Sequence, residues 1–150
     1  MHIQTDSVLI TRSKTSARSV AIILLGGNFN NKVNAVTGQF ALNNLSQIYA
    51  DKLFFGVDGI SPKFGCTVPT QSEAEIVRTM IARTRGLVAV VTDHSKWGVV
   101  SNFEVATLEH INTLITDDGI DQEAYSQLIS QSVDILITHS KLIQEGRADL

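Results

Sequence analysis

The sequence predicts an α/β fold in which helices cover both faces of a mostly parallel sheet. Short apolar runs rich in β-branched residues alternate with segments whose apolar residues recur at helical spacing. This alternation is typical of a parallel sheet covered by helices. The apolar runs lack a polar alternate position, as strands do when both of their faces are buried. Together these observations indicate a three-layer architecture.

Strands are predicted wherever an apolar run is bounded by turn residues. In chain order, these runs lie at residues 8–11, 20–25, 52–57, 86–92, 113–116 and 133–138. Turns follow several of them, at Gly26 and Gly27, at residues 56–59 and at residues 117–119. The sequence therefore predicts strands that each end in a short polar or glycine-containing loop.

Helices are predicted between the strands. Residues 36–49 and 72–85 carry apolar side chains near helical spacing, and residues 121–130 follow a turn. Ser72 is the expected cap of the second helix, with Glu73 in the first turn, where the helix dipole favours a carboxylate. The polar segment 139–150 is either a short docked helix or a frayed tail.

Composition restricts the class of protein. A chain of 150 residues with 43% hydrophobic residues is expected to form a single domain over residues 1–150. Its net charge of -3 provides no basic stripe, so DNA binding by this chain alone is not expected. No apolar run approaches the roughly 20 residues of a membrane span, and the amino terminus lacks the apolar region of a signal peptide. With one cysteine, Cys66, a reducing cytoplasmic location is expected.

Candidate binding residues follow the predicted strands, because ligands of open α/β sheets lie beyond the carboxyl ends of the strands. Cations, hydroxyls and glycine backbone N–H groups at these positions would supply donors for phosphate oxygens. A phosphorylated sugar or similar metabolite is therefore the predicted ligand. The predicted ligand-binding residues are Thr11, Arg12, Ser13, Gly26, Gly27, Asp58, Gly59, Glu73, Asp93, Ser95 and Lys96.

Structural roles compete with these assignments. Gly26 and Gly27 suit a turn at positive φ as well as a phosphate loop. Asp58 is equally suited to tying down its own turn, and Glu73 to complementing the helix dipole. Lys96 is either a solvated loop lysine or a ligand contact oriented by Asp93. The histidines show no pair at metal-ligand spacing, so neither a metal nor a cofactor is predicted.

The order of several motifs resembles a known family. The motifs are residues 22–27 (IILLGG), Gly38, residues 50–60 (ADKLFFGVDGI), Glu73-Ala74, Arg78, Met80, residues 93–96 (DHSK) and residues 115–117 (ITD). In their order and spacing, the chain from Val8 to Thr138 is similar to the carboxyl-terminal sensor domain of the DeoR family of bacterial transcription regulators.

This resemblance implies a Rossmann-like fold related to ribose-5-phosphate isomerase and glucosamine-6-phosphate deaminase. It also implies a repressor of sugar metabolism that senses a phosphorylated sugar and forms homo-oligomers. Asp58, Glu73 and Lys96 match positions that handle substrate in the related isomerases. In a regulator they would bind the effector without turning it over, so the resemblance implies no catalytic residue and no enzyme.

Two departures from the family pattern accompany the resemblance. Family members normally begin with a winged helix-turn-helix, followed by a β-α unit with an Asp-x-Gly-Thr-Thr type loop, and the chain is expected to lack both. DNA contact would then need such a winged helix in a longer protein. Arg12 stands where the family usually has asparagine. A missing inner strand is expected to expose a sheet edge, which self-association would cover.

The leading functional prediction is an effector-binding module whose ligand shifts a conformational or oligomeric equilibrium. One alternative is a sugar-phosphate isomerase-like enzyme with Asp58 and Glu73 as acid and base. Another is a remnant that only pairs with full-length regulators.

Overall fold

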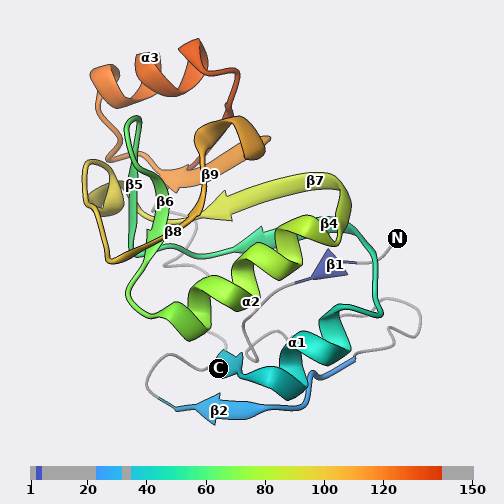
Figure 1. Ribbon diagram of the computed structural model, residues 1–150. Coiled ribbons are helices and arrows are strands. Elements are labelled where there is room, and N and C mark those ends of the chain that lie inside the picture. Colours follow the sequence, from blue (N-terminus) through green and yellow to red (C-terminus); the bar gives the residue numbers. More distant parts are fainter. Residues whose placement is uncertain (1–2, 5–22, 32–34, 140–150) are drawn as a thin grey trace, which may run out of the picture.

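The computed structural model describes residues 3–4, 23–31 and 35–139, which form an α/β fold built on one main sheet (Figure 1). The main sheet is parallel, with the strand order β1-β4-β7-β9-β10. Its strands are β1 (Ile3–Gln4), β4 (Ala50–Phe55), β7 (Thr84–Val91), β9 (Thr113–Asp117) and β10 (Asp134–Thr138). The predicted α/β class with a mostly parallel, Rossmann-like sheet is confirmed.

The strands predicted at 52–57, 86–92, 113–116 and 133–138 correspond to β4, β7, β9 and β10. The strand predicted at 8–11 lies outside the described residues. Of the run predicted at 20–25, residues 23–25 are described, and they are not in a strand. The parallel strands all end at the same edge of the sheet, so the loops that follow β4, β7 and β9 are neighbours in space.

Two antiparallel sheets were not expected from the sequence. Strand β2 (Asn28–Asn30) pairs with β3 (Ala35–Thr37). A second small sheet has the order β5-β6-β8, with β5 (Gly59–Ser61), β6 (Gly65–Val68) and β8 (Phe103–Ala106). Figure 1 shows this second sheet beside the carboxyl ends of the main strands, where it forms one side of the loop region.

Helices α1 (Gln39–Leu45), α2 (Gln71–Ala82) and α3 (Gln122–Ser130) occupy the predicted helical segments. Helix α1 is shorter than predicted, because residues 36 and 37 belong to β3. The prediction that Ser72 caps α2 is wrong. Thr70 is the cap, because its hydroxyl accepts a hydrogen bond from the Glu73 N–H (3.3 Å). None of the helices in the described ranges has the length and apolar character that a membrane span requires.

The core joins the helices to one face of the main sheet. Leu53, Val88 and Leu114 point to this face and share one buried cluster with Met80 of α2 and Leu128 of α3. Residues in alternate positions point to the opposite face and do not belong to that cluster. Strand β10 is largely exposed, so the prediction that every strand is buried on both faces is wrong for β10. As the terminal strand of the described sheet, it has a neighbour on one side only.

Candidate functional site

A cleft of about 230 Å³ opens at the carboxyl end of β4. Residues 56–58 follow β4 directly, and Glu73 comes from the first turn of α2, so a strand end and a helix start converge here. The remaining wall is apolar. The cleft is lined by Ala35, Gly56, Val57, Asp58, Val68, Glu73 and Val77. The structure thus brings together the two carboxylates that the sequence singled out, Asp58 and Glu73.

The backbone of Asp58 is fixed, while its side chain is exposed to solvent. Its N–H donates to the Thr67 carbonyl in β6 (3.0 Å). Among the described residues, none donates a hydrogen bond to its carboxylate. The alternative that Asp58 ties down its own turn through its side chain is not supported by these contacts.

Glu73 contributes to the end of α2 as well as to the cleft. Its half-buried carboxylate accepts a hydrogen bond from the Thr70 hydroxyl (2.8 Å), and the same hydroxyl accepts from the Glu73 N–H. This reciprocal arrangement is a form of capping box. The structural and the ligand-facing roles proposed for Glu73 are therefore compatible, because the cap holds the carboxylate at the cleft wall.

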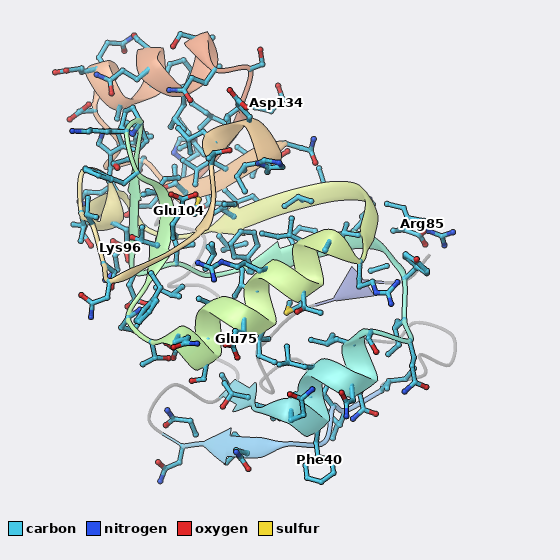
Figure 2. The ribbon with its side chains drawn as sticks, viewed as in Figure 1. Phe40, Glu75, Arg85, Lys96, Glu104 and Asp134 are labelled. Carbon is cyan, nitrogen blue, oxygen red and sulfur yellow. The ribbon has the colours of Figure 1, made fainter. Side chains whose placement is uncertain are left out.

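Gly59 allows the turn after Asp58 to pack against the loop that follows Lys96. A Cβ atom on Gly59 would lie 2.3 Å from the carbonyl oxygen of Val99, which is too close for any side chain. Beside it, the Gly98 N–H donates to the Ile60 carbonyl (2.8 Å), and Ile60 forms a β-bridge with Trp97. The Asp58 turn and the Lys96 loop are therefore adjacent at one end of the sheet. Figure 2 shows Lys96 on this loop, on the side of β5 and β6.

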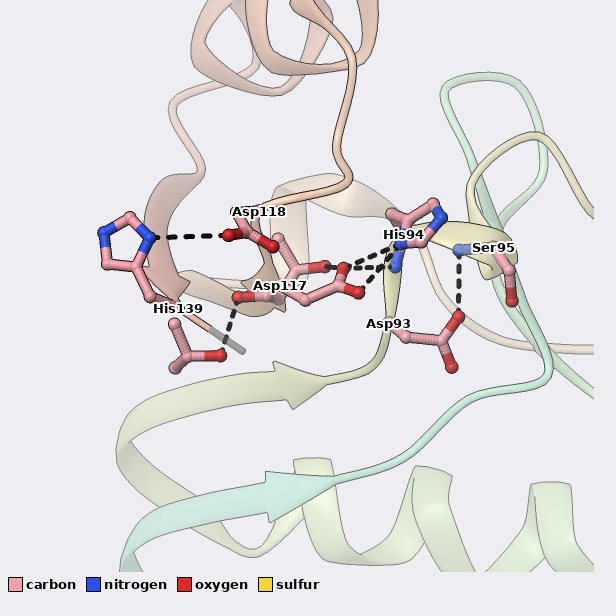
Figure 3. A network of polar contacts seen from close by, with 8 residues as sticks. Asp93, His94, Ser95, Asp117, Asp118 and His139 are labelled. Atoms are coloured by element: carbon pink, nitrogen blue, oxygen red, sulfur yellow. Dashed lines mark hydrogen bonds and ion pairs between the residues drawn. The ribbon is translucent and has the colours of Figure 1, made fainter. Parts of the chain in front are cut away.

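A second polar group lies at the carboxyl ends of β7, β9 and β10 (Figure 3). Here the 3-10 helix η2 (His94–Lys96) begins with a cap in which the Asp93 carboxylate accepts from the Ser95 N–H (2.9 Å). Asp117, at the end of β9, accepts from the His94 N–H (2.8 Å) and contacts the His94 ring Nδ1 (2.8 Å). The turn after β7 is thus held from two sides by carboxylates.

These contacts shift the ionisation of the groups involved. The hydrogen bond and the charge of Asp117 raise the pKa of His94 above its usual value. The same hydrogen bond lowers the pKa of Asp117. Hydrogen bonds from Ser95 lower the pKa of Asp93. Asp93 therefore stays ionised while it orders the turn that carries Lys96.

Asp117 was missing from the predicted site residues. It follows a predicted strand, so the rule that selected Asp58 and Asp93 also points to it. Next to it, the Asp118 carboxylate lies 3.5 Å from His139 Nδ1. No group of three or more His, Cys, Asp or Glu suited to a metal ion occurs in the described part of the chain.

The other predicted site residues lie elsewhere. Thr11, Arg12 and Ser13 fall outside the described residues. Gly26 and Gly27 are exposed and do not line the cleft. Gly27 has a φ of 153°, and a Cβ atom there would lie 2.7 Å from the Thr37 carbonyl oxygen, so the glycine is needed for close packing against β3. Asp93, Ser95 and Lys96 form the neighbouring turn described above.

Cys66 is fully buried in β6 as a free thiol, and burial raises its pKa to about 12. Cys66 is not among the residues that line the cleft.

Comparison with known proteins identifies the family. The model of the DeoR C-terminal sensor domain matches residues 1–118. The chain is 30% identical over 135 residues to the HTH-type transcriptional repressor GlcR of Bacillus subtilis, covering 89% of this chain and 51% of the relative. It is 33% identical over 109 residues to the HTH-type transcriptional regulator GolR of Listeria innocua, covering 73% and 42%. It is 29% identical over 113 residues to the HTH-type transcriptional regulator GlpR of Haloferax volcanii, covering 75% and 44%.

The chain thus spans about half the length of the curated relatives it matches, and these relatives are transcriptional regulators. The family match covers the strands that end at the cleft and at the His94 turn. The chain belongs to the DeoR C-terminal sensor domain family.

Proposed function

We propose that this chain is the effector-binding module of a DeoR-type repressor of sugar metabolism, and that it binds a phosphorylated sugar or a related metabolite. The observation that carries the proposal is the cleft in which Asp58, at a strand end, faces the same hollow as Glu73, at a helix start. Clefts at the carboxyl ends of parallel strands are the usual ligand sites of open α/β sheets.

The lining suits a sugar better than an anion alone. Ionised carboxylates accept hydrogen bonds from hydroxyl groups, and Val57, Val68 and Val77 provide an apolar wall for a carbon skeleton. Two carboxylates repel a phosphate, so the phosphate belongs at the end of the ligand away from Asp58 and Glu73. Lys96 and the hydroxyl of Ser95, on the adjacent turn, are donors suited to it.

In a regulator, binding matters through its effect on other parts of the molecule. The matched relatives are helix-turn-helix regulators of about twice the matched length. We therefore place this chain as the sensor that acts with a DNA-binding domain, in the same polypeptide or in a partner. A ligand that prefers one conformation shifts the equilibrium by its difference in affinity for the two states. In this proposal the cleft binds the effector without turning it over.

Thermal denaturation with a panel of pentose and hexose phosphates tests the proposal. A ligand that binds only the folded state stabilises it by about 2.7 kcal/mol at a concentration of 100 times Kd. At least one sugar phosphate is expected to raise Tm, whereas inorganic phosphate and the unphosphorylated sugars are expected to have little effect. Conversion of ribose 5-phosphate during incubation would instead support an isomerase.

Two variants connect the thermal shift to the site. Asp58→Asn weakens hydrogen bonds to sugar hydroxyls, and Lys96→Ala removes the cation proposed for the phosphate. Each variant is therefore expected to lower the apparent affinity for the sugar phosphate at least tenfold, which reduces the rise in Tm at a given ligand concentration. Lys63→Ala, an exposed lysine in the turn between β5 and β6, is the matched control and keeps the shift. A shift that survives both site variants, or no shift with any sugar phosphate, would overturn the proposal.

A further inference from the structure

The turn that carries Lys96 is attached to other strands on both sides of this residue. Before Lys96, the His94 N–H donates to the Asp117 carboxylate at the end of β9 (2.8 Å). After Lys96, the Gly98 N–H donates to the Ile60 carbonyl of β5 (2.8 Å). Lys96 is half-buried and lies between these two attachments along the chain. Its position therefore depends on contacts with β9 and β5, which are distant from it in the sequence.

The Asp117 carboxylate contacts His94 in two ways. One oxygen accepts from the backbone N–H, and the ring Nδ1 lies 3.0 Å from that oxygen and 2.8 Å from the other (Figure 3). The contacts of Asp93, by contrast, stay inside the turn, where its carboxylate accepts from the Ser95 N–H and its carbonyl accepts from the Lys96 N–H. Asp93 therefore shapes the turn, whereas Asp117 attaches the turn to the main sheet.

We propose that Asp117 is a positioning residue for ligand binding: by holding His94, it keeps the turn in the arrangement in which Lys96 meets the phosphate of the ligand. This inference rests on the proposed function, in which Lys96 and Ser95 contact that phosphate. Without Asp117, the turn is in the binding arrangement for only part of the time, and the apparent affinity falls in proportion to that fraction.

The charge of Asp117 alone predicts the opposite effect. A carboxylate near a phosphate site repels an anionic ligand, so the removal of this charge would strengthen binding if Asp117 had no other role. A positioning role predicts weaker binding when Asp117 is removed. The direction of the change in affinity therefore distinguishes the two roles.

Protonation of His94 gives a second way to detect the positioning role. Three carboxylates lie around His94 and raise its pKa: Asp117 at the end of β9 has the largest effect, and Asp93 in the same turn and Asp118 in the loop after β9 add to it. Protonated His94 forms an ion pair with Asp117, whereas the neutral ring forms only a hydrogen bond. Binding of a sugar phosphate is therefore expected to be tighter below the raised pKa of His94 than above it.

Calorimetric titration with a sugar phosphate tests the positioning role. The probe is the pentose or hexose phosphate that raises Tm most, and its Kd is measured for each variant whose circular dichroism spectrum is unchanged. Asp117→Ala is expected to weaken binding about tenfold, as it would if the turn kept the binding arrangement about a tenth of the time. Asp117→Asn, which keeps an oxygen for the His94 N–H, is expected to bind with intermediate affinity. Asp118→Ala is the matched control, because it removes the same charge from a residue that contacts His139 instead, and it is expected to bind no less tightly than the unmodified chain.

The pH profile of Kd is the second part of the test. His94→Asn keeps an amide that can donate to Asp117 but cannot be protonated in the same range of pH. The second ionisation of the phosphate ester, with a pKa of about 6, affects both proteins equally, so the ratio of their Kd values reports on His94. The Kd of His94→Asn divided by that of the unmodified chain is expected to rise about threefold between about pH 8.5 and about pH 6.

The outcomes separate this inference from the proposed function. If no sugar phosphate binds to the unmodified chain, the proposed function fails and this inference fails with it. If one binds, and Asp117→Ala binds it as tightly as Asp118→Ala does, Asp117 has no positioning role while the proposed function stands. A Kd ratio that stays constant with pH would overturn the contribution of His94.

Discussion

At the scale of single residues, Asp117 organises the turn that carries Lys96. Its carboxylate accepts from the His94 backbone N–H and also contacts the His94 ring. The ring in turn lies against Gly119, where a Cβ atom would be 2.3 Å from Nδ1. Asp117 therefore fixes His94 in position without contacting the cleft, and it connects the end of β9 to the turn after β7.

Titration of His94 is the first prediction at this scale. Its pKa is raised by Asp117, so the stabilisation is fully present below the ordinary value of 6.5 and is lost as pH rises through the raised pKa. The pKa of Asp117 is lowered, so its stabilisation is present above 3.8 and is lost as pH falls through the lowered pKa. The ion pair between His94 and Asp117 therefore stabilises the fold most between pH 3.8 and pH 6.5. Because this pair is exposed to solvent, its contribution to stability is small.

NMR titration of the His94 ring measures this effect. The midpoint is expected above 6.5 in the unmodified chain and close to 6.5 in Asp117→Asn. Asp118→Asn is the control, because Asp118 is the smallest of the influences on His94 and contacts His139 instead. An unchanged His94 midpoint in Asp117→Asn would show that the contact does not persist in solution.

The site residues differ in how far the sequence predicts them. Asp58 and Glu73 follow from their places at a strand end and a helix start, and the structure joins them in one cleft. The same rule does not show that Lys96 lies on an adjacent turn rather than in that cleft, because this depends on how the Asp58 turn packs against Val99. Such packing is set by contacts between distant segments, which a local pattern does not contain.

At the scale of elements, the long strands of the main sheet are predictable from the sequence, whereas the small antiparallel sheet β5-β6-β8 is not. Strands β7 and β9 are rich in β-branched residues, and β4 ends in the apolar residues Leu53, Phe54 and Phe55. Strands β5 and β6 are short, at 3 and 4 residues, and the polar residues Ser61 and Thr67 keep either from forming an apolar run like those that predict the main strands. Each also begins at a glycine, a residue that is rare in strands. Strand β6 pairs with β8, far along the chain, and β5 pairs with β6.

The cap of α2 supplies the prediction at the element scale. Thr70→Ala removes the hydroxyl that binds both the N–H and the carboxylate of Glu73, so it is expected to reduce stability by about 1 kcal/mol. Ser72→Ala is the matched control, since among the described residues the Ser72 hydroxyl hydrogen-bonds the Thr70 hydroxyl alone (3.2 Å), and little change is expected. Urea denaturation of the two variants measures the difference. A larger loss of stability in Ser72→Ala than in Thr70→Ala would contradict the assignment of Thr70 as the cap of α2.

At the scale of the whole molecule, a single buried cluster connects the main sheet to the small antiparallel sheet. Leu53 and Val90 of the main sheet belong to the same cluster as Cys66 and Val105 of the small sheet, and Leu128 brings in α3. Trp97 packs against this cluster from the loop beside β5. The cleft therefore lies between parts that share one core, and a change in one part affects the packing of the other.

Shared packing predicts a single cooperative unfolding transition for the chain. Trp97 is the only tryptophan, so its fluorescence reports on the loop beside the small sheet, whereas far-ultraviolet circular dichroism follows all helices and strands. Both signals are expected to change at the same temperature, as two-state unfolding requires. Met80→Ala, which removes a fully buried side chain of α2, is expected to cost about 2–5 kcal/mol and to lower both transitions equally. A fluorescence transition that precedes the circular dichroism transition would show instead that the loop and the small sheet unfold independently, and the cluster would then not act as one core.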